Sequence, residues 1–290
     1  MRRTIVLVSL CALFAACVPT SSTTTTSPEP VPSTTVAPPT TAVDGPTCAA
    51  GDARYTTNGL LAAPGEESGN AVALASVRWR DLGECERLVL DFLTQAGSPA
   101  SRLGLSAATL IAESGIVRVN LPPEVEAAGI ADSLIDGPLV ERVYVADVPG
   151  SGMIVDIHLG AEVEARSFAV ESPARLVIDV RTSDEAEAVL GHPTLAGDVV
   201  VLTPAAGPNL YPLRLAGYAR PGTPAVRVWL VLEGEVVVDR SIVLTASDAW
   251  SWYEATITDG PSGAVELFIG ELDELGGPSA GGANLTIDVP

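Results

Sequence analysis

The residue types that most often do chemistry are scarce in this chain. It has two histidines, His158 and His192, four cysteines and no lysine. A serine or cysteine hydrolase needs a histidine base, and the sequence has no Gly-X-Ser-X-Gly turn to present a nucleophile to one. Without lysine there is also no Schiff-base chemistry and no phosphate-loop lysine. The sequence therefore predicts a protein that is not an enzyme, in which His158 lies on a strand or at the surface.

Ligands for a metal ion are also few. A zinc site needs three or four His, Cys or acidic ligands, and the supply of histidine and free cysteine is too small. Glu271, Asp273 and Glu274 carry the oxygen atoms that calcium prefers, but they lack the ordered Asp-X-Asp-X-Asp-Gly spacing. A solvated charged turn is the simpler interpretation, and we expect no metal ion and no cofactor.

The four cysteines fall into two groups. Cys11 and Cys17 lie near the N-terminus, whereas Cys48 and Cys85 belong to the body of the chain. Outside the cytoplasm an isolated pair most simply forms a disulfide, here Cys48–Cys85, with two unpaired thiols as the alternative.

The N-terminus has the organisation of an export signal. Arg2 and Arg3 precede an apolar stretch at residues 5–16. This stretch is shorter than the roughly 20 residues of a membrane-spanning helix, but it suits a signal peptide.

The sequence Leu-Phe-Ala-Ala-Cys that ends at Cys17 resembles the lipobox of bacterial lipoproteins. The resemblance implies that residues 1–16 are a lipoprotein signal peptide. A lipid that includes palmitate would then be attached to Cys17 and would anchor the protein on the extracytoplasmic face of the cell membrane. Cleavage with release of the protein is the alternative.

Residues 17–47 form a Thr/Pro-rich linker after the lipidated cysteine. The segment has no apolar periodicity, so we expect it to be disordered. Proline keeps such a chain extended, and at about 3.1 Å per residue it would reach at most roughly 90 Å. It would hold the folded part away from the membrane.

The charge of the chain limits its partners. The formal net charge is -20, and 47% of the residues are hydrophobic while only 4% are aromatic. Acidity on this scale argues against nucleic acid as a partner, because a phosphate backbone needs a positive surface. It also argues against polybasic docking on anionic lipid.

The body of the chain begins with a series of short strand patterns bounded by Gly or Pro. Residues 124–136, which follow two prolines and precede a glycine, are the best helix candidate. We expect one mostly β domain over residues 48–184. Its predicted strands are 73–80, 87–92, 140–148, 153–159 and 175–180.

A second strand series follows a linker at residues 185–197. Its regular spacing is close to that of a β-sandwich, which we expect over residues 198–290. The predicted fold class is therefore mostly β, with two β domains after a disordered segment. The second series comprises residues 199–203, 213–219, 226–232, 235–244, 250–257, 264–269 and 284–289.

The second half resembles the immunoglobulin-like domain associated with bacterial spore germination, of the Gmad type. The matching features are Val-Leu-Thr-Pro at 201–204, Leu-Ala-Gly-Tyr-Ala-Arg at 215–220 and Thr-Ile-Asp-Val at 286–289. The resemblance implies a sandwich for adhesion or spacing, with no catalytic residues to carry over.

The first half resembles the AMIN-like domains of actinobacterial lipoproteins, which are related to the wall-targeting modules of N-acetylmuramoyl-L-alanine amidases. The matching features are Val-Arg-Trp at 77–79, Glu-Arg-Leu-Val-Leu-Asp-Phe at 86–92 and Ser-Pro-Ala-Arg-Leu-Val-Ile-Asp-Val at 172–180. Glu86 stands where the family has Asp, a change that we expect to matter little. The resemblance implies location in the cell envelope and binding of peptidoglycan or a protein.

Two aromatic groups are candidates for ligand contact. Trp250 and Trp252 lie on one face of a strand and could stack on sugars if that face points outward; pointing inward, they would be core. If Trp79 points inward, Arg78 and Arg80 point outward and form a small cationic patch that could contact an anionic wall polymer. A solvated sheet face is the alternative.

These observations predict a non-catalytic lipoprotein of the cell envelope. Its partners would be the membrane, through the lipid at Cys17, and peptidoglycan or another cell-wall component. The alternative is a scaffold that recruits a cell-wall enzyme or receptor.

Overall fold

The computed structural model describes residues 48, 54–62, 68–127, 129–183, 192–245 and 247–290. The signal peptide, Cys17, the linker up to residue 47 and residues 185–191 of the second linker lie outside this set, so the interpretations of them stay predictions. Within the described ranges, no helix is both long and apolar enough to cross a membrane.

Strands dominate the described chain, which confirms the mostly β fold class. Every strand predicted from the sequence is present, with ends that shift by at most two residues. In the first half the elements are β1 (Gly59–Ala62), β2 (Ala73–Asp81), β3 (Glu86–Leu93), β4 (Ala107–Ile111), the 3-10 turn η1 (Ala112–Ser114), β5 (Ile116–Asn120), β6 (Glu126–Ala127), β7 (Asp132–Leu134), β8 (Val140–Val148), β9 (Gly152–Leu159), β10 (Val163–Val170) and β11 (Arg175–Thr182).

The second half begins with β12, which lies within the predicted linker at 185–197 and pairs with β13. Its strands are β12 (Thr194–Leu195), β13 (Val199–Thr203), β14 (Gly207–Pro208), β15 (Leu213–Ala219), β16 (Ala225–Leu232), β17 (Glu235–Val243), β18 (Trp250–Ile257), β19 (Gly263–Gly270) and β20 (Ala283–Val289).

The predicted helix at residues 124–136 is wrong. The described part of this range contains β6, which pairs in parallel with β2, and β7, which pairs antiparallel with β8. Hydrogen bonds to strands of two existing sheets therefore decide the structure of this segment. The flanking prolines and glycine that suggested a helix have a weaker effect than this tertiary pairing.

Three strands of five or more residues, β4, β5 and β10, were not expected from the sequence. β4 and β5 form a hairpin around η1 and Gly115, whose φ of 61° is the left-handed conformation that glycine adopts easily. β10 has Val163, Ala165 and Ser167 at the buried positions of its inward face, so Val163 is the one branched apolar residue among them and the strand pattern is weak.

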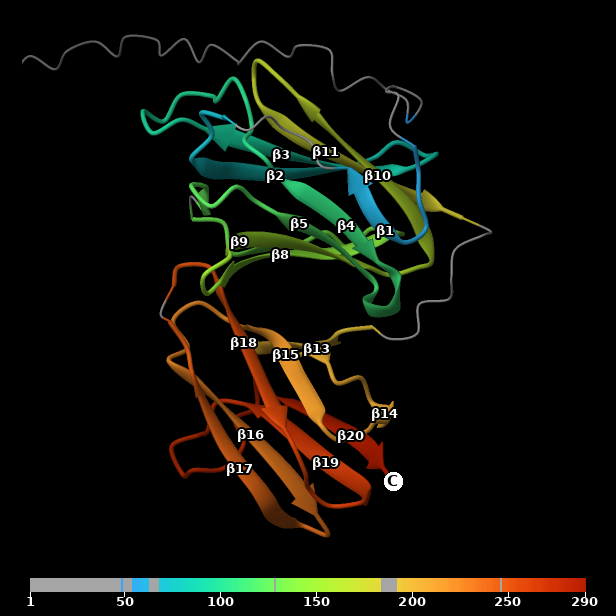
Figure 1. Cartoon of the computed structure of the whole chain (residues 1–290), viewed down its shortest axis with the longest axis vertical. Helices are drawn as coiled ribbons and strands as arrows, with labels where there is room; N and C mark the ends of the chain where they lie inside the picture. The colour runs from blue at the N-terminus through green and yellow to red at the C-terminus, as the bar shows by residue number, and fades with distance from the viewer. Residues whose placement is uncertain (1–47, 49–53, 63–67, 128, 184–191, 246) are drawn as a thin grey trace, which may run out of the picture. The chain divides into compact units, whose positions relative to one another are not determined.

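The first half is a sandwich of two sheets. One sheet has the strand order β10-β11-β3-β2-β6, and it lies over β1-β4-β5-β9-β8, as Figure 1 shows. Large apolar residues from both sheets fill the space between them, among them Leu88, Phe92, Ile178, Val119 and Ile157.

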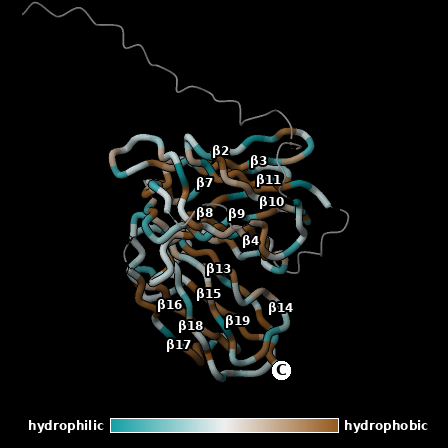
Figure 2. The backbone as a smooth tube through the Cα atoms, turned by 45° about the horizontal axis from the view of Figure 1, so that its top comes forward, coloured by the Kyte–Doolittle hydropathy of each residue, from teal (hydrophilic) through white to brown (hydrophobic). Residues whose placement is uncertain are grey.

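The second half is also a sandwich. Its sheet β14-β20-β19-β16-β17 packs against β18-β15-β13-β12 through a separate core that includes Val228, Leu267 and Tyr253. The buried Tyr253 hydroxyl donates a hydrogen bond of 3.0 Å to the carbonyl oxygen of Val200. In Figure 2 the hydrophobic stretches follow the strands of both sandwiches.

The two sandwiches also contact each other. β8 and β18 pair in parallel at Ala146 and Trp250, which joins strands from both halves into one ten-stranded sheet. A third apolar cluster lies beside this pairing and contains Tyr144 and Ile154 from the first sandwich with Tyr218 and Trp250 from the second. The strands β8 and β9 are therefore covered on both faces.

Glu86 links the two sheets of the first sandwich. Its buried carboxylate accepts a hydrogen bond of 2.9 Å from the Trp79 indole on β2. It also accepts bonds of 2.7 and 3.0 Å from the backbone N–H groups of Leu139 and Val140, where β8 begins. The side chain of Glu86 is long enough to reach both the Trp79 indole on β2 and the start of β8.

We expect Glu86→Gln to lower the free energy of unfolding by about 2 kcal/mol, because one end of the amide cannot accept the hydrogen bonds that the carboxylate accepts. Urea denaturation of the chain from residue 17 onward measures this loss. Glu84→Gln, at an exposed position two residues away, is the matched control and should leave the midpoint unchanged. Equal midpoints for the two variants would contradict the linking role of Glu86.

Candidate functional site

The outer face of the sheet β10-β11-β3-β2-β6 carries a dense group of charges. Successive residues of a strand point to opposite faces, so Leu88 and Leu90 of β3 enter the core while Arg87 and Asp91 point outward. The pairing register brings outward residues of four strands side by side. We call this surface the arginine face; it consists of Arg78, Arg80, Arg87, Arg166, Arg175 and Arg181 with the acids Asp91, Glu164 and Asp179.

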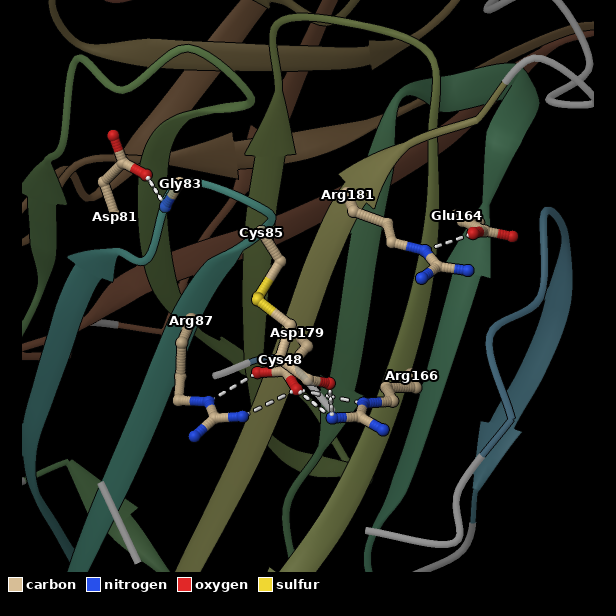
Figure 3. Close-up of a disulfide and its surroundings, with 9 residues drawn as sticks. All are labelled: Cys48, Asp81, Gly83, Cys85, Arg87, Glu164, Arg166, Asp179 and Arg181. Atoms are coloured by element: carbon tan, nitrogen blue, oxygen red, sulfur yellow. Dashed lines mark hydrogen bonds and ion pairs between the residues drawn. A yellow bond between two sulfur atoms is a disulfide. The ribbon is translucent and has the colours of Figure 1, made fainter. Parts of the chain in front are cut away.

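Asp179 on β11 lies at the centre of the arginine face, between two arginines (Figure 3). Arg87 on β3 donates hydrogen bonds of 2.6 and 2.9 Å to its two oxygens. Arg166 on β10 donates bonds of 2.9 and 2.7 Å to one of the same oxygens. All three side chains are buried, so one carboxylate is shared by two desolvated cations.

The disulfide Cys48–Cys85 lies beside this group, as Figure 3 shows. Its Cα atoms are 6.1 Å apart, and the structure confirms the predicted pairing. The carbonyl oxygen of Cys48 accepts a hydrogen bond from Arg166. Cys48 thus contacts the buried centre of the arginine face.

Asp91 organises the second group on the arginine face. Arg78 donates bonds of 2.7 and 3.1 Å to it, Ser76 donates one of 2.6 Å, and Arg175 lies 3.2 Å away. Partial burial alone would raise the pKa of Asp91. The hydrogen bonds from Arg78 and Ser76 and the charges of both arginines prevail and lower the pKa below its usual range. Asp91 therefore stays ionised and holds both arginines in place.

The accessible cations lie at opposite sides of the arginine face. Arg78 and Arg80 on β2 are exposed, the former by 45% of its side chain. Arg181 on β11 is exposed to the same extent, pairs with Glu164 and lies 4.0 Å over the Tyr55 ring. The buried ion pairs of Arg87 and Arg166 with Asp179 fix the sheet surface that presents these exposed groups.

The predicted ligand-contact residues are divided between this surface and the interior. Arg78 and Arg80 point outward on the arginine face, whereas Trp79 points inward and packs against the core. Trp250 is buried and Trp252 half-buried where the second sandwich contacts the first. A sugar therefore has no access to the Trp250 ring in this arrangement.

His158 lies in the same contact layer between the sandwiches. Its Nε2 shares a hydrogen bond with the hydroxyl of Tyr218, and both side chains are buried. Burial, together with the charges of Arg118 and Arg142, lowers the pKa of His158 to about 3. Burial raises the pKa of Tyr218 well above its usual range. The pair is therefore uncharged and structural at neutral pH.

Asp156 is the second buried polar group of this layer. Arg118 donates bonds of 2.8 and 2.6 Å to its two oxygens and lies 5.0 Å from the Trp252 ring. Burial raises the pKa of Asp156 against the opposing effect of Arg118. In this layer the carboxylate of Asp156 is therefore paired with Arg118, and the imidazole of His158 is paired with the hydroxyl of Tyr218.

The acidic turn at residues 271–274 has a structural explanation. One carboxylate oxygen of Asp273 accepts bonds of 2.9 and 2.7 Å from the backbone N–H groups of Leu275 and Gly277. Across the part of the chain that the structure describes, no group of three or more His, Cys, Asp or Glu residues is arranged to hold a metal ion.

Comparison of the chain with protein-family models, with curated proteins and with solved structures finds no match in any of the three. Its function must therefore be argued from its own residues.

Sequence reasoning found only Arg78 and Arg80 of the arginine face. It missed Arg87, Arg166, Arg175 and Arg181, although each alternates with apolar residues along a strand. That alternation is the available signal, but the order β10-β11-β3-β2, which brings the arginines together, comes from tertiary pairing.

We expect Asp179→Asn to lower the free energy of unfolding by about 3 kcal/mol or more, because it leaves two buried arginines without their anion. Asp91→Asn is the comparison: its carboxylate is 25% exposed, so water can replace part of the lost interaction and the loss should be smaller. Chemical denaturation measures both. A smaller loss for Asp179→Asn than for Asp91→Asn would contradict this account.

The low pKa of His158 predicts a pH dependence of stability. The unfolded chain protonates this histidine near pH 6.5 and the folded chain only near 3, so the folded state loses stability as pH falls through this window. The expected slope is about 1.4 kcal/mol per pH unit. His158→Gln should flatten this slope in denaturation curves taken from pH 7 to 4, and His192→Gln, at an exposed position, should not. An unchanged slope in His158→Gln would refute the assignment.

Proposed function

We propose that this chain is a non-catalytic lipoprotein of the bacterial cell envelope that binds an anionic component of the cell wall, such as peptidoglycan, through the arginine face. The observation that carries the proposal is the local reversal of charge. The whole chain has a net charge of -20, yet on this face the arginines outnumber the acids two to one. Charge complementarity of this kind favours an anionic partner.

The resemblances noted in the sequence are consistent with this proposal. Residues 48–184 would be an AMIN-like β domain and residues 198–290 an immunoglobulin-like sandwich. The arginine face lies in the first of these, whose family resemblance implies wall binding. Lipidation of Cys17 would fix the protein on the extracytoplasmic face of the membrane, and the linker would bring the arginine face to the wall.

The alternative is a scaffold that recruits a wall enzyme or receptor. It is favoured by exposed valines at the edge strand β17, where Val236, Val237 and Val243 are 48%, 46% and 82% exposed. Exposed apolar residues of this kind are typical of protein contacts. Arg240 points to the inward side of the same strand, opposite buried Val228, which disfavours addition of a further strand.

A sedimentation assay with purified peptidoglycan tests the proposal. We expect the chain without its signal peptide to co-sediment at low salt and to be released at high salt, because exposed charges are screened. Arg80→Glu should reduce the bound fraction. Arg240→Glu, which reverses an exposed arginine in the second sandwich, is the matched control and should bind as the unmodified chain does.

Two results would reject the proposal. The chain could stay in the supernatant at every salt concentration, or Arg80→Glu and Arg240→Glu could lower binding equally. Turnover of wall material by the purified chain would reject the non-catalytic part.

A further inference from the structure

The residues that follow the N-terminal linker are fastened to the first sandwich at successive points. Cys48 is bonded to Cys85, and the backbones of Thr56 and Ala165 exchange two hydrogen bonds of 2.9 Å. The ring of Tyr55 lies beside two guanidinium groups, 4.9 Å from that of Arg166. β1 then pairs with β4.

These attachments differ in strength. β1 has four residues, lies at the edge of its sheet and pairs in the sheet only with β4. β3 has eight residues and lies between β2 and β11, with registers that run along most of its length on both sides. Cys85 directly precedes β3, so the disulfide bonds the N-terminal segment to a central strand.

We infer that the Cys48–Cys85 disulfide is a mechanical junction that transfers tension from the N-terminal side of the chain into β3. The covalent path through the two sulfur atoms bypasses residues 49–84, which include β1 and β2. Without the disulfide, the same tension would reach the attachments at the Cys48 carbonyl, Thr56 and β1 before it reached β3.

The geometry explains why the path matters. An edge strand can be removed one residue pair at a time, since each pair depends on a single neighbour. β3 is held by two neighbours at once, and its buried leucines must leave the core with it. The carbonyl of Cys48 is also bonded to Arg166, whose partner Asp179 belongs to β11. The junction is thus supported on three strands of one sheet.

The inference rests on the proposed function for the origin of the tension. A lipid at Cys17 and a wall contact on the arginine face would load the segment between them whenever membrane and wall move apart. The route of tension inside the fold follows from the disulfide alone, so it is tested without membrane or wall.

Single-molecule extension tests the route. The chain from residue 17 onward, with Cys17→Ser and handles at both ends, is pulled in oxidised form and as the double variant Cys48→Ser/Cys85→Ser. We expect the double variant to extend first in a low-force step that the oxidised chain lacks. Its fully extended length should be greater by the 37-residue loop, roughly 130 Å.

Thr56→Pro is the decisive control, because it removes the N–H that bonds to Ala165 without touching the disulfide. In the oxidised chain it should leave the first unfolding force unchanged, since tension bypasses Thr56. In the double variant it should lower the force of the early step.

The double variant could fail to fold, so a second experiment adds a thiol reductant to the folded, tethered chain that keeps Cys48 and Cys85. It should produce the same early step. Equal first forces with and without the disulfide, or a lower force for Thr56→Pro in the oxidised chain, would overturn the inference. Because the assay contains no wall material, a failure here differs from a failure of peptidoglycan binding.

Discussion

The register between β3 and β11 determines both the core of the first sandwich and its charged surface. Leu88 pairs with Ile178 and Leu90 with Leu176 on the inner face, while Arg87 pairs with Asp179 on the outer face. Because side chains alternate along a strand, a slip of one residue would place arginines in the core and leucines in water. The buried charges therefore help to specify the pairing that brings them together.

Asp179 shows that the buried charges of this surface depend on one another. One buried carboxylate serves two buried arginines, and the carbonyl of Cys48 accepts a further bond from one of them. Removal of any partner would leave a desolvated charge, which costs far more than an exposed pair is worth. The disulfide and the ion pairs are thus parts of one arrangement, because the disulfide holds Cys48, whose carbonyl is bonded to Arg166.

The contact layer between the two sandwiches buries polar residues among apolar ones. β8 and β9 are covered on both faces, yet their second face carries Asp156 and His158 among apolar residues such as Ala146 and Ile154. Arg118 neutralises the first, and Tyr218, from the other sandwich, satisfies the second. Buried polar groups are tolerated when each has a partner, and here the partners also define how the two surfaces match.

The sequence by itself determined the strands with clear alternation and the mostly β class, because these depend on periodicity and residue type. It favoured the Cys48–Cys85 pair over two unpaired thiols, and the structure shows the bond. The sequence could not determine β6 and β7, which form through pairing with strands of existing sheets. Nor could it determine β10, because Val163 is the one branched apolar residue among the buried residues of its inward face. The position of Trp250 was likewise open, since periodicity shows that Trp250 and Trp252 share a face but not what covers it. Only the tertiary structure placed a second sheet there, and only the order of β10, β11, β3 and β2 collected six separate arginines into one face.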